Sequence, residues 1–553
     1  MTISEEIAKM RAYPFSALLL ATLLVGCGTN PVTGKREIQF VSEAAELRIG
    51  AENYAPMRQS EGGDFKIDPE LTTYISEVGQ KLAAVSDRKL PYEFVVLNSS
   101  VPNAWALPGG KVALNRGLLT ELHSESELAA VLGHEITHAA ARHGAKAQER
   151  GTFLQVGMVA AQIGLAANDT NGTLANLALQ GTGLGAQLVQ MKYGRDQENE
   201  ADHYGMVYMK RAGYDLHGAV TLQETFVRLA SETGKNQGWL EGLFASHPPS
   251  VERVALNKLT LTELTAAPGT ASSNAPGAAA GVAGDVGIER FMARTAQLRT
   301  LKPAYDKHDA AVAAANKKDF VAARKLAAEA SKLLPREGRF PQLQGDIEMA
   351  EKKPKEALPY YEKAIALSSD YFGSFLGGGI AKYKLGDKAG AREWLTKSSE
   401  LLPTAPAAYY LGHLANEGGD RIKALEYLKA AAGVNGEIGK LAADEYLTLD
   451  LPQNPGNYVA TGAQLDSNGH AFVTVQNRAN VAIEGIEITP LMVDQFGQIA
   501  QQGQRHMLPL ALQPGESATV DAGIGNLSAA QAAQLRFRVD AARAAAAPTS
   551  TGN

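Results

Sequence analysis

Three changes of pattern along 553 residues predict a multidomain fold: a mainly α-helical domain with a small β-sheet, an α-solenoid of repeats and a small C-terminal β-sandwich. Helical periodicity dominates residues 42–262, a period of about 34 residues follows over 289–450, and alternating β-branched segments occupy 455–541. A chain of this length exceeds what one hydrophobic core supports, so several domains are expected.

Composition limits the classes of function. Hydrophobic residues make up 45% of the chain and charged residues 20%, as in ordinary globular proteins. The net charge of −6 gives no electrostatic reason to expect a nucleic-acid partner. The sequence holds one cysteine, Cys27, so an intrachain disulfide is excluded.

Residues 1–26 have the layout of a secretory signal peptide, because Lys9 and Arg11 precede an apolar run that is too short to span a membrane. The run ends in Leu-Val-Gly-Cys, which resembles the lipobox of bacterial lipoproteins. This resemblance implies that Cys27 is lipidated and begins a tether over 27–41. Gly28 implies, by the same resemblance, the periplasmic face of the outer membrane. A plain signal peptide with a chance cysteine is the alternative.

Residues 42–119 predict helices, a strand and a hairpin in succession. The helical patterns cover 42–57 and 69–86, a β-branched run covers 92–98, and a hairpin with the turn Pro108-Gly109-Gly110 covers 103–119. An extended polypeptide can add to the edge strand of such a hairpin through backbone hydrogen bonds. We therefore expect Asn103 and Ala104 to contact unfolded or loop segments of a substrate.

The next segment predicts a helix over about 125–143, because Ser124 and Glu127 match a capping box and Gly144 suits a C-terminal cap. This helix carries the stretch HEITH.

Two histidines of that stretch, His134 and His138, are four residues apart and share one helix face. They can offer two imidazoles to one metal ion, with Glu135 beside them to hold a water molecule. This is the H-E-x-x-H pattern of zinc enzymes, and we expect one Zn²⁺ per chain. A helix with solvated histidines is the alternative.

A catalytic zinc needs a third protein ligand and an open fourth position. One group of zinc peptidases takes a histidine ten residues after the first, but Gly144 stands there, and we expect the neighbouring His143 to be structural.

A later helix offers acidic residues instead. Glu198 and Asp202 are four apart and share a face, with Ala201 and Gly205 beside them to allow close helix packing. Glu200 is expected to point away into solvent.

Residues 151–190 are rich in Ala, Gly and Leu. The apolar run is short and contains glutamines, so we predict a helical hairpin that covers the site rather than a membrane span. Contact with a membrane surface is the alternative.

Residues 263–288 are low-complexity Ala, Gly, Pro and Ser, which predicts a flexible linker. Beyond it, small residues recur every 33 or 34 positions: Ala323, Ala357, Ala391 and Ala424, and Gly345, Gly379 and Gly412. The period resembles the tetratricopeptide repeat, whose paired helices pack closely and form a concave surface for peptide segments. An alanine-rich bundle is the alternative.

Segments such as HAFVTVQN and ESATVDAG, separated by Gly-containing turns, predict an antiparallel β-sandwich over 455–541. Residues 542–553 predict a disordered tail.

Four motifs in this order carry a specific resemblance to a family: NAWALPGGKVALNRGLL, HEITH, RDQENEAD and SHPPSVER. Over residues 28–262 the chain resembles the HtpX and CAAX-protease group, family forty-eight of the zinc metallopeptidases. The resemblance implies a gluzincin-type metallopeptidase domain over 42–262. Joined to tetratricopeptide repeats, the arrangement is similar to a periplasmic member of the family, from which the lipobox and the C-terminal β region depart.

The resemblance assigns roles to single residues. It implies that His134, His138 and Glu198 bind zinc and that Asp202 orients a ligand histidine through its other ring nitrogen. Glu135 would take a proton from the attacking water and pass it to the leaving amine.

Two further roles follow from the same resemblance. His247 can approach the zinc from a loop and fill the fourth position, which would exclude the catalytic water and lock the site. A rigid turn in which His247 caps the next helix is the alternative. Arg253 either stabilises the developing oxyanion or forms a structural salt bridge.

The leading hypothesis is a lipid-anchored periplasmic zinc endopeptidase that cleaves misfolded or misassembled envelope proteins. Its repeats would bind these clients or the envelope assembly machinery. The alternative is a tetratricopeptide chaperone or scaffold lipoprotein whose peptidase site is locked or silent. The complete motif set argues against a decayed enzyme and leaves a locked one open.

Overall fold

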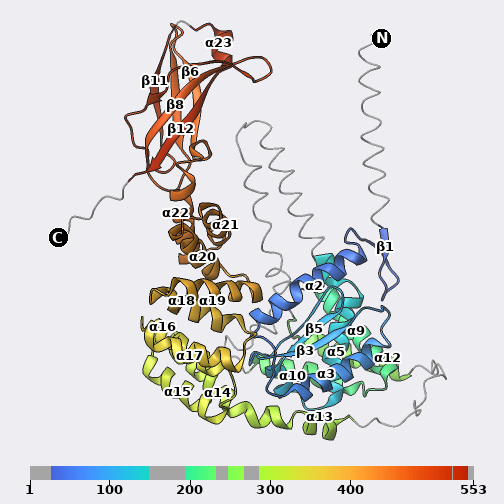
Figure 1. Ribbon diagram of the computed structural model, residues 1–553. Coiled ribbons are helices and arrows are strands. Elements are labelled where there is room, and N and C mark those ends of the chain that lie inside the picture. The colour runs from blue at the N-terminus through green and yellow to red at the C-terminus, as the bar shows by residue number, and fades with distance from the viewer. Residues whose placement is uncertain (1–26, 148–192, 232–246, 267–285, 526, 546–553) are drawn as a thin grey trace, which may run out of the picture. The chain divides into compact units, whose positions relative to one another are not determined.

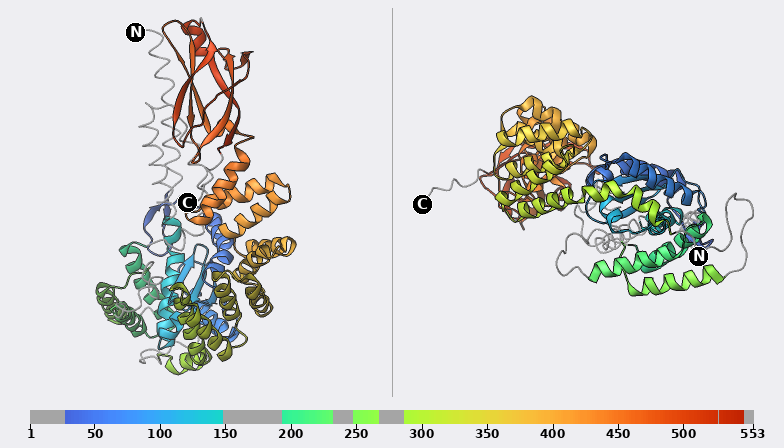
Figure 2. Two further views of the ribbon diagram at one scale, coloured as in Figure 1. Left: turned by 90° about the vertical axis from the view of Figure 1, so that its left-hand side faces the viewer. Right: turned by 90° about the horizontal axis from the view of Figure 1, so that it is seen from below.

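The computed structural model describes residues 27–147, 193–231, 247–266, 286–525 and 527–545. The predicted signal peptide, the whole segment expected to cover the site and most of the predicted linker lie outside these ranges. The chain divides into two compact units, Met1–Leu402 and Pro403–Asn553, whose elements are drawn in Figures 1 and 2. Within the described ranges, no helix combines the length and the apolar character needed to cross a membrane.

A hairpin opens the described chain. Its strands are β1 (Cys27–Thr29) and β2 (Arg36–Ile38), which pair antiparallel. The Asn30 side-chain oxygen accepts hydrogen bonds from the backbone nitrogens of Val32 and Thr33 at 2.9 and 3.2 Å, and this closes the turn. The segment expected to be an extended tether is therefore a folded hairpin.

A small mixed sheet follows. Its strands are β3 (Glu93–Leu97), β4 (Ala104–Leu107) and β5 (Lys111–Asn115), in the order β3-β5-β4. β4 is antiparallel to β5, which confirms the predicted hairpin over 104–115, whereas residues Arg116–Glu121 form the short helix α4. β4 lies at an edge, since no other strand of the described ranges pairs with it.

Helices pack on both faces of this sheet. They are α2 (Glu43–Ser60), α3 (Pro69–Ala83), α5 (Glu125–Ala140), α9 (Arg195–Ala212), α10 (His217–Ser231) and α12 (Val251–Ala266). The sheet and helices bury two apolar clusters, a large one with α3, α5, α9 and α10 and a small one with α2. All 16 residues of α5 are buried, so this helix lies at the centre of the domain. α12 continues four residues into the predicted linker because Leu264 packs on the core.

The ends of α5 differ in detail from the prediction. Ser124 accepts from the backbone nitrogen of Glu127 at 3.1 Å, as expected, but the Glu127 carboxylate accepts from the backbone of His123 instead of Ser124. The helix ends at Ala140, and Gly144 does not cap it.

The residue in the left-handed region after α5 is Arg142, with φ 62°. A side chain in this conformation is strained, and tertiary contacts compensate the strain. The Arg142 guanidinium lies 3.1 Å from the Glu46 carboxylate and donates to the carbonyl oxygen of Val41. Contacts with a distant segment therefore replace the glycine cap.

The predicted repeats are pairs of helices that lie side by side (Figures 1 and 2). The first unit contains α13 (Ile288–Arg294), α14 (Ala296–Asn316), α15 (Phe320–Leu333), α16 (Arg339–Ala350), α17 (Pro354–Leu367), α18 (Phe372–Lys384) and α19 (Lys388–Leu401). The second unit contains α20 (Ala405–Glu417), α21 (Arg421–Ala432) and α22 (Glu437–Asp450).

The periodic small residues lie where the paired helices touch. The four predicted alanines are fully buried. A Cβ on Gly379 would lie 2.8 Å from Leu395, and one on Gly412 would lie 2.8 Å from Leu428. A Cβ at either position would force the facing leucine to shift, which supports the physical reason given for the period.

The second unit ends in the predicted antiparallel β domain. Its strands are β6 (Val459–Leu465), β7 (Ala471–Asn477), β8 (Ile483–Val493), β9 (Ile499–Gln502), β10 (His506–Met507), β11 (Ser517–Ile524) and β12 (Leu535–Ala544), with short helices η3 (Pro455–Asn457) and α23 (Ala529–Gln534). Two sheets form, in the orders β11-β7-β6 and β10-β8-β12, with β9 also on β8.

One boundary of this domain was predicted wrongly. Ala542 is buried and Ala544 pairs with Ile483, so residues 542–544 complete β12 instead of beginning a disordered tail. The rest of the predicted tail, from residue 546, lies outside the described ranges.

Candidate metal and catalytic centre

Two neighbouring helices supply most of a buried polar site. The side chains are His134, Glu135 and His138 of α5 and Glu198 and Asp202 of α9. The helices approach closely because two glycines face each other. A Cβ on Gly205 would lie 2.9 Å from the backbone nitrogen of His134, and one on Gly133 would lie 2.9 Å from the carbonyl oxygen of Gly205. Gly205 was expected in this role, and Gly133 was not.

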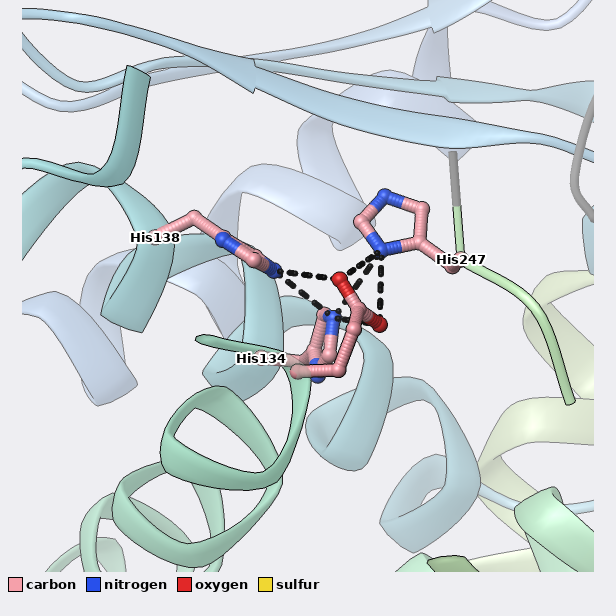
Figure 3. Close-up of side chains that lie close together, drawn as sticks. His134, His138 and His247 are labelled. Carbon is pink, nitrogen blue, oxygen red and sulfur yellow. Dashed lines mark hydrogen bonds and ion pairs between the residues drawn. The ribbon is translucent and has the colours of Figure 1, made fainter. Parts of the chain in front are cut away.

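Four buried side chains converge on one point. The ligand atoms of His134, His138, Glu198 and His247 all lie within 4.8 Å of one another. Figure 3 shows the three labelled imidazoles directed toward one carboxylate. His134 Nε2 lies 3.0 Å from His138 Nε2, and His138 Nε2 lies 3.4 Å from Glu198 Oε1. Ligand atoms around one tetrahedral zinc are about 3.3 Å apart, so these separations suit a single ion.

The outer ring nitrogens of both helix histidines have partners already. His134 Nδ1 lies 2.8 Å from Asp202 Oδ1, and His138 Nδ1 lies 2.8 Å from His143 Nδ1. With the proton on Nδ1 in each ring, a lone pair remains on each Nε2. Two lone pairs and the Glu198 carboxylate then face each other, and a cation removes their repulsion. The donor set of imidazole nitrogen and carboxylate oxygen fits Zn²⁺.

The protonation states also suit a metal. Burial holds the pKa of His138 well below its usual value, so the ring is neutral. Burial alone would raise the pKa of Glu198, but the neighbouring histidines outweigh it, and the pKa lies well below the usual value. Metal ligands must be deprotonated in this way.

Glu135 is set apart from this group. Burial raises the pKa of its carboxyl, and Oε2 is buried with no hydrogen-bond partner in the described part of the chain. A buried polar atom without a partner is costly, and a water molecule held beside the metal would satisfy it.

Asp202 is held by three side chains. His134 contacts Oδ1, Gln223 Nε2 donates to the same oxygen at 3.3 Å, and Arg253 binds both oxygens at 2.8 Å. Arg253 Nη1 lies 3.0 Å from Glu198 Oε2 and also donates to the carbonyl oxygen of Pro248 at 3.3 Å. All three guanidinium nitrogens are therefore engaged. Of the two roles considered for Arg253, the geometry favours the structural salt bridge.

His247 occupies the fourth place of the cluster. Its Nδ1 lies 3.2 Å from His134 Nε2 and 3.0 Å from Glu198 Oε1, and its Nε2 lies 3.6 Å from Glu135 Oε1. It does not cap α12, because Ser250 accepts from the backbone nitrogen of Arg253 at 3.1 Å and takes that role.

Three residues around His138 have roles that the sequence did not indicate. Tyr193 stacks on His138 with ring centroids 4.0 Å apart and planes at 24°. His143, expected to be only structural, contacts the outer nitrogen of His138. Glu200, expected in solvent, lies 3.1 Å from His143 Nε2, so that expectation was wrong. The chain turns at Arg142 and brings His143 over α9, a contact that no helical spacing reveals.

A pocket extends from the site toward the sheet edge. Apolar side chains line it, among them Leu118, Val131, Met206, Leu222 and Phe226. Ala104 of β4 contributes to the same wall. Asn103 precedes Ala104 at the start of this edge strand.

A buried H-E-x-x-H helix that faces a glutamate of a second helix defines a metallopeptidase site of the gluzincin type. The metal that this site implies is zinc. The chain belongs to peptidase family M48, whose model matches residues 69–259.

Curated relatives agree with this family. The chain is 32% identical to metalloprotease YcaL of Escherichia coli over 242 residues, which are 42% of this chain and 90% of that protein. It is 33% identical to the β-barrel assembly-enhancing protease of Yersinia pestis over 220 residues, 36% of this chain and 44% of that protein. It is 32% identical to the mitochondrial metalloendopeptidase OMA1 of Schizosaccharomyces pombe over 227 residues, 40% of this chain and 63% of that protein.

The chain thus spans less than two thirds of the Yersinia and fission-yeast relatives. The similarity to the β-barrel assembly-enhancing protease, expected from the motifs joined to repeats, is confirmed.

Gly205→Ala tests the helix contact on which the cluster depends. The added methyl group meets the backbone of His134, which cannot move aside, so α9 shifts outward and carries Glu198 with it. We expect zinc affinity, measured by competition with a chelator, to fall about tenfold. Arg195→Ala, an exposed position on the same helix, is the control and should bind zinc normally. Equal affinities in the two variants would contradict the prediction.

Proposed function

We propose that the protein is a zinc-dependent endopeptidase that hydrolyses peptide bonds in unfolded or misassembled proteins of the bacterial envelope. The observation that carries the proposal is the buried cluster of His134, His138 and Glu198 with Glu135 beside it, whose Oε2 has no hydrogen-bond partner among the described residues.

His134, His138 and Glu198 would hold the metal. When bound, zinc supplies a Lewis acid that polarises a peptide carbonyl and lowers the pKa of a water molecule to about 7. Glu135 would accept a proton from the attacking water and pass it to the leaving amine. The raised pKa of its buried carboxyl suits a group that must both take and give a proton near neutral pH. Asp202 keeps the proton of His134 on Nδ1.

An extended substrate fits the surroundings of the site. Among the described strands only β5 pairs with β4, so a polypeptide could add to its other edge by backbone hydrogen bonds, with Asn103 and Ala104 as its first contacts. The adjoining apolar pocket would take an apolar side chain of the same segment. Folded domains rarely offer extended segments, so unfolded and loop regions are the preferred substrates.

The repeats would bring such clients, or the envelope assembly machinery, to the peptidase. The repeat helices of the first unit pack on the peptidase: the Gln59 side chain donates to the Asp370 carbonyl at 2.8 Å and accepts from the Phe372 backbone at 3.0 Å. Cys27 would carry the lipid that anchors the protein at the periplasmic face of the outer membrane. The lipobox resemblance supports this location, as do the relatives named for β-barrel assembly.

A second candidate function rests on His247. Because His247 fills the fourth place of the cluster, the resting enzyme would be locked, and the repeats would act as a chaperone or scaffold while the lock holds. The two activities belong to the same chain, and release of His247 would convert one into the other.

Glu135→Gln separates metal binding from catalysis. The amide cannot accept the proton of the water, so cleavage of an unfolded model protein should fall at least about 100-fold while the zinc content stays at one per chain. Proteolysis and zinc content are measured on the same samples. Persistent cleavage in this variant would refute the proposed mechanism, whereas absence of zinc from the unaltered protein would refute the metal site.

His247→Ala tests the lock. Removal of the fourth ligand opens a position for water and substrate, so cleavage should rise severalfold even though zinc is held by one ligand fewer. His217→Ala, an exposed histidine at the start of α10, serves as the matched control. Lower cleavage in His247→Ala with zinc still bound would show that His247 assists the reaction instead of blocking it.

A further inference from the structure

The two ligand histidines of α5 are held in different ways. His134 reaches a carboxylate directly, since its Nδ1 lies 2.8 Å from Asp202. His138 reaches one through a second imidazole: its Nδ1 lies 2.8 Å from His143 Nδ1, and His143 Nε2 lies 3.1 Å from Glu200 Oε1. His143 is fully buried, so this contact is shielded from water.

The order of these contacts fixes where each proton sits. Glu200 accepts, so His143 carries its proton on Nε2 and offers a lone pair on Nδ1. That lone pair accepts the Nδ1 proton of His138, which leaves His138 Nε2 unprotonated and directed into the cluster. Without the carboxylate, His143 can place a proton on Nδ1, where it opposes the proton of His138.

Glu200 is itself held by the N-terminal hairpin (blue in Figure 1). Asn30 Nδ2 donates to Glu200 Oε1 at 3.4 Å, and Asn30 is fully buried. A second contact holds the same hairpin in place, because Lys146 lies 2.7 Å from Glu37 of β2. The hairpin therefore packs on two segments: the one after α5, which contains His143, and the start of α9, which contains Glu200.

We propose that His143, Glu200 and Asn30 are positioning residues that fix the tautomer and orientation of His138, and that the hairpin of residues 27–38 is thereby part of the metal site. The proposal rests on the proposed zinc site. Since the hairpin begins at the predicted lipidated residue, the segment that ties the chain to the membrane also supports a metal ligand. Detachment of the hairpin would therefore weaken metal binding, even though the hairpin does not contact the metal position.

Zinc affinity of the full-length protein, measured by competition with a chelator, tests the contacts made by His143 and Glu200. Glu200→Ala and His143→Ala should bind zinc about tenfold more weakly, as is usual when a partner of a ligand histidine is lost. Glu200→Gln keeps an oxygen that accepts from His143 and should recover most of the affinity. Asp196→Ala, an exposed acid on the same helix, is the matched control.

A cobalt-substituted sample separates positioning from loss of folding. At saturating Co²⁺ the visible absorption bands report the ligands of the ion, and they should shift in Glu200→Ala and return in Glu200→Gln. Unshifted bands in Glu200→Ala, or a Gln variant as weak as the Ala variant, would overturn the proposal. Absence of zinc from the unaltered protein would instead refute the proposed function.

The hairpin is tested by Asn30→Asp. The aspartate keeps the oxygen that closes the turn but places a carboxylate oxygen against Glu200, and against Glu37 of the same hairpin, in place of the donor. We expect zinc affinity to fall about threefold and the cobalt bands to shift in the same direction as in Glu200→Ala. Lys35→Ala, an exposed position in the same hairpin, should leave both unchanged. If Asn30→Asp matches Lys35→Ala in both measurements, the hairpin is not part of the metal site.

Discussion

The contact of Gly133 with Gly205 is the constraint on which the site depends. A Cβ at either position would meet backbone atoms of the other helix at 2.9 Å, and backbone atoms cannot rotate away. The two helices can therefore approach only where both residues are glycine. This approach brings the carboxylate of Glu198 within 3.4 Å of His138 and that of Asp202 within 2.8 Å of His134. Ligand geometry thus follows from backbone packing.

Because α5 is enclosed by the domain, the charged groups of the site are buried. The buried groups near the metal position include the three carboxyls Glu135, Glu198 and Asp202 and one guanidinium, Arg253. When all are ionised and the histidines are neutral, two negative charges are left over, and one divalent cation balances them. Buried charges without partners are strongly destabilising. Zinc bound by these residues would therefore stabilise the core, and metal binding would be coupled to folding of this unit.

Much of this arrangement is visible in the sequence because local rules govern it. The four-residue spacings of His134 and His138, and of Glu198 and Asp202, place each pair on one helix face, and Gly205 marks where the helices meet. The failures have one cause. Arg142 takes the place of a glycine cap because it forms an ion pair with Glu46. Glu200 does not point into solvent because its carboxylate contacts His143. These contacts join residues 57 or more positions apart, and spacing within one element carries no information about them.

Among the members of the described cluster, His247 differs from the other three because it does not lie on a helix. His134 and His138 cannot leave without unwinding α5, and Glu198 cannot leave without moving α9 across its glycine contact. His247 precedes α12 on an irregular segment, so its release disturbs no helix. Its helix remains held meanwhile, because Arg253 stays bound to Asp202 and Glu198. The rigid residues would therefore keep a bound metal if His247 moved away and water took its place, which is the condition for a site that is both stable and able to open.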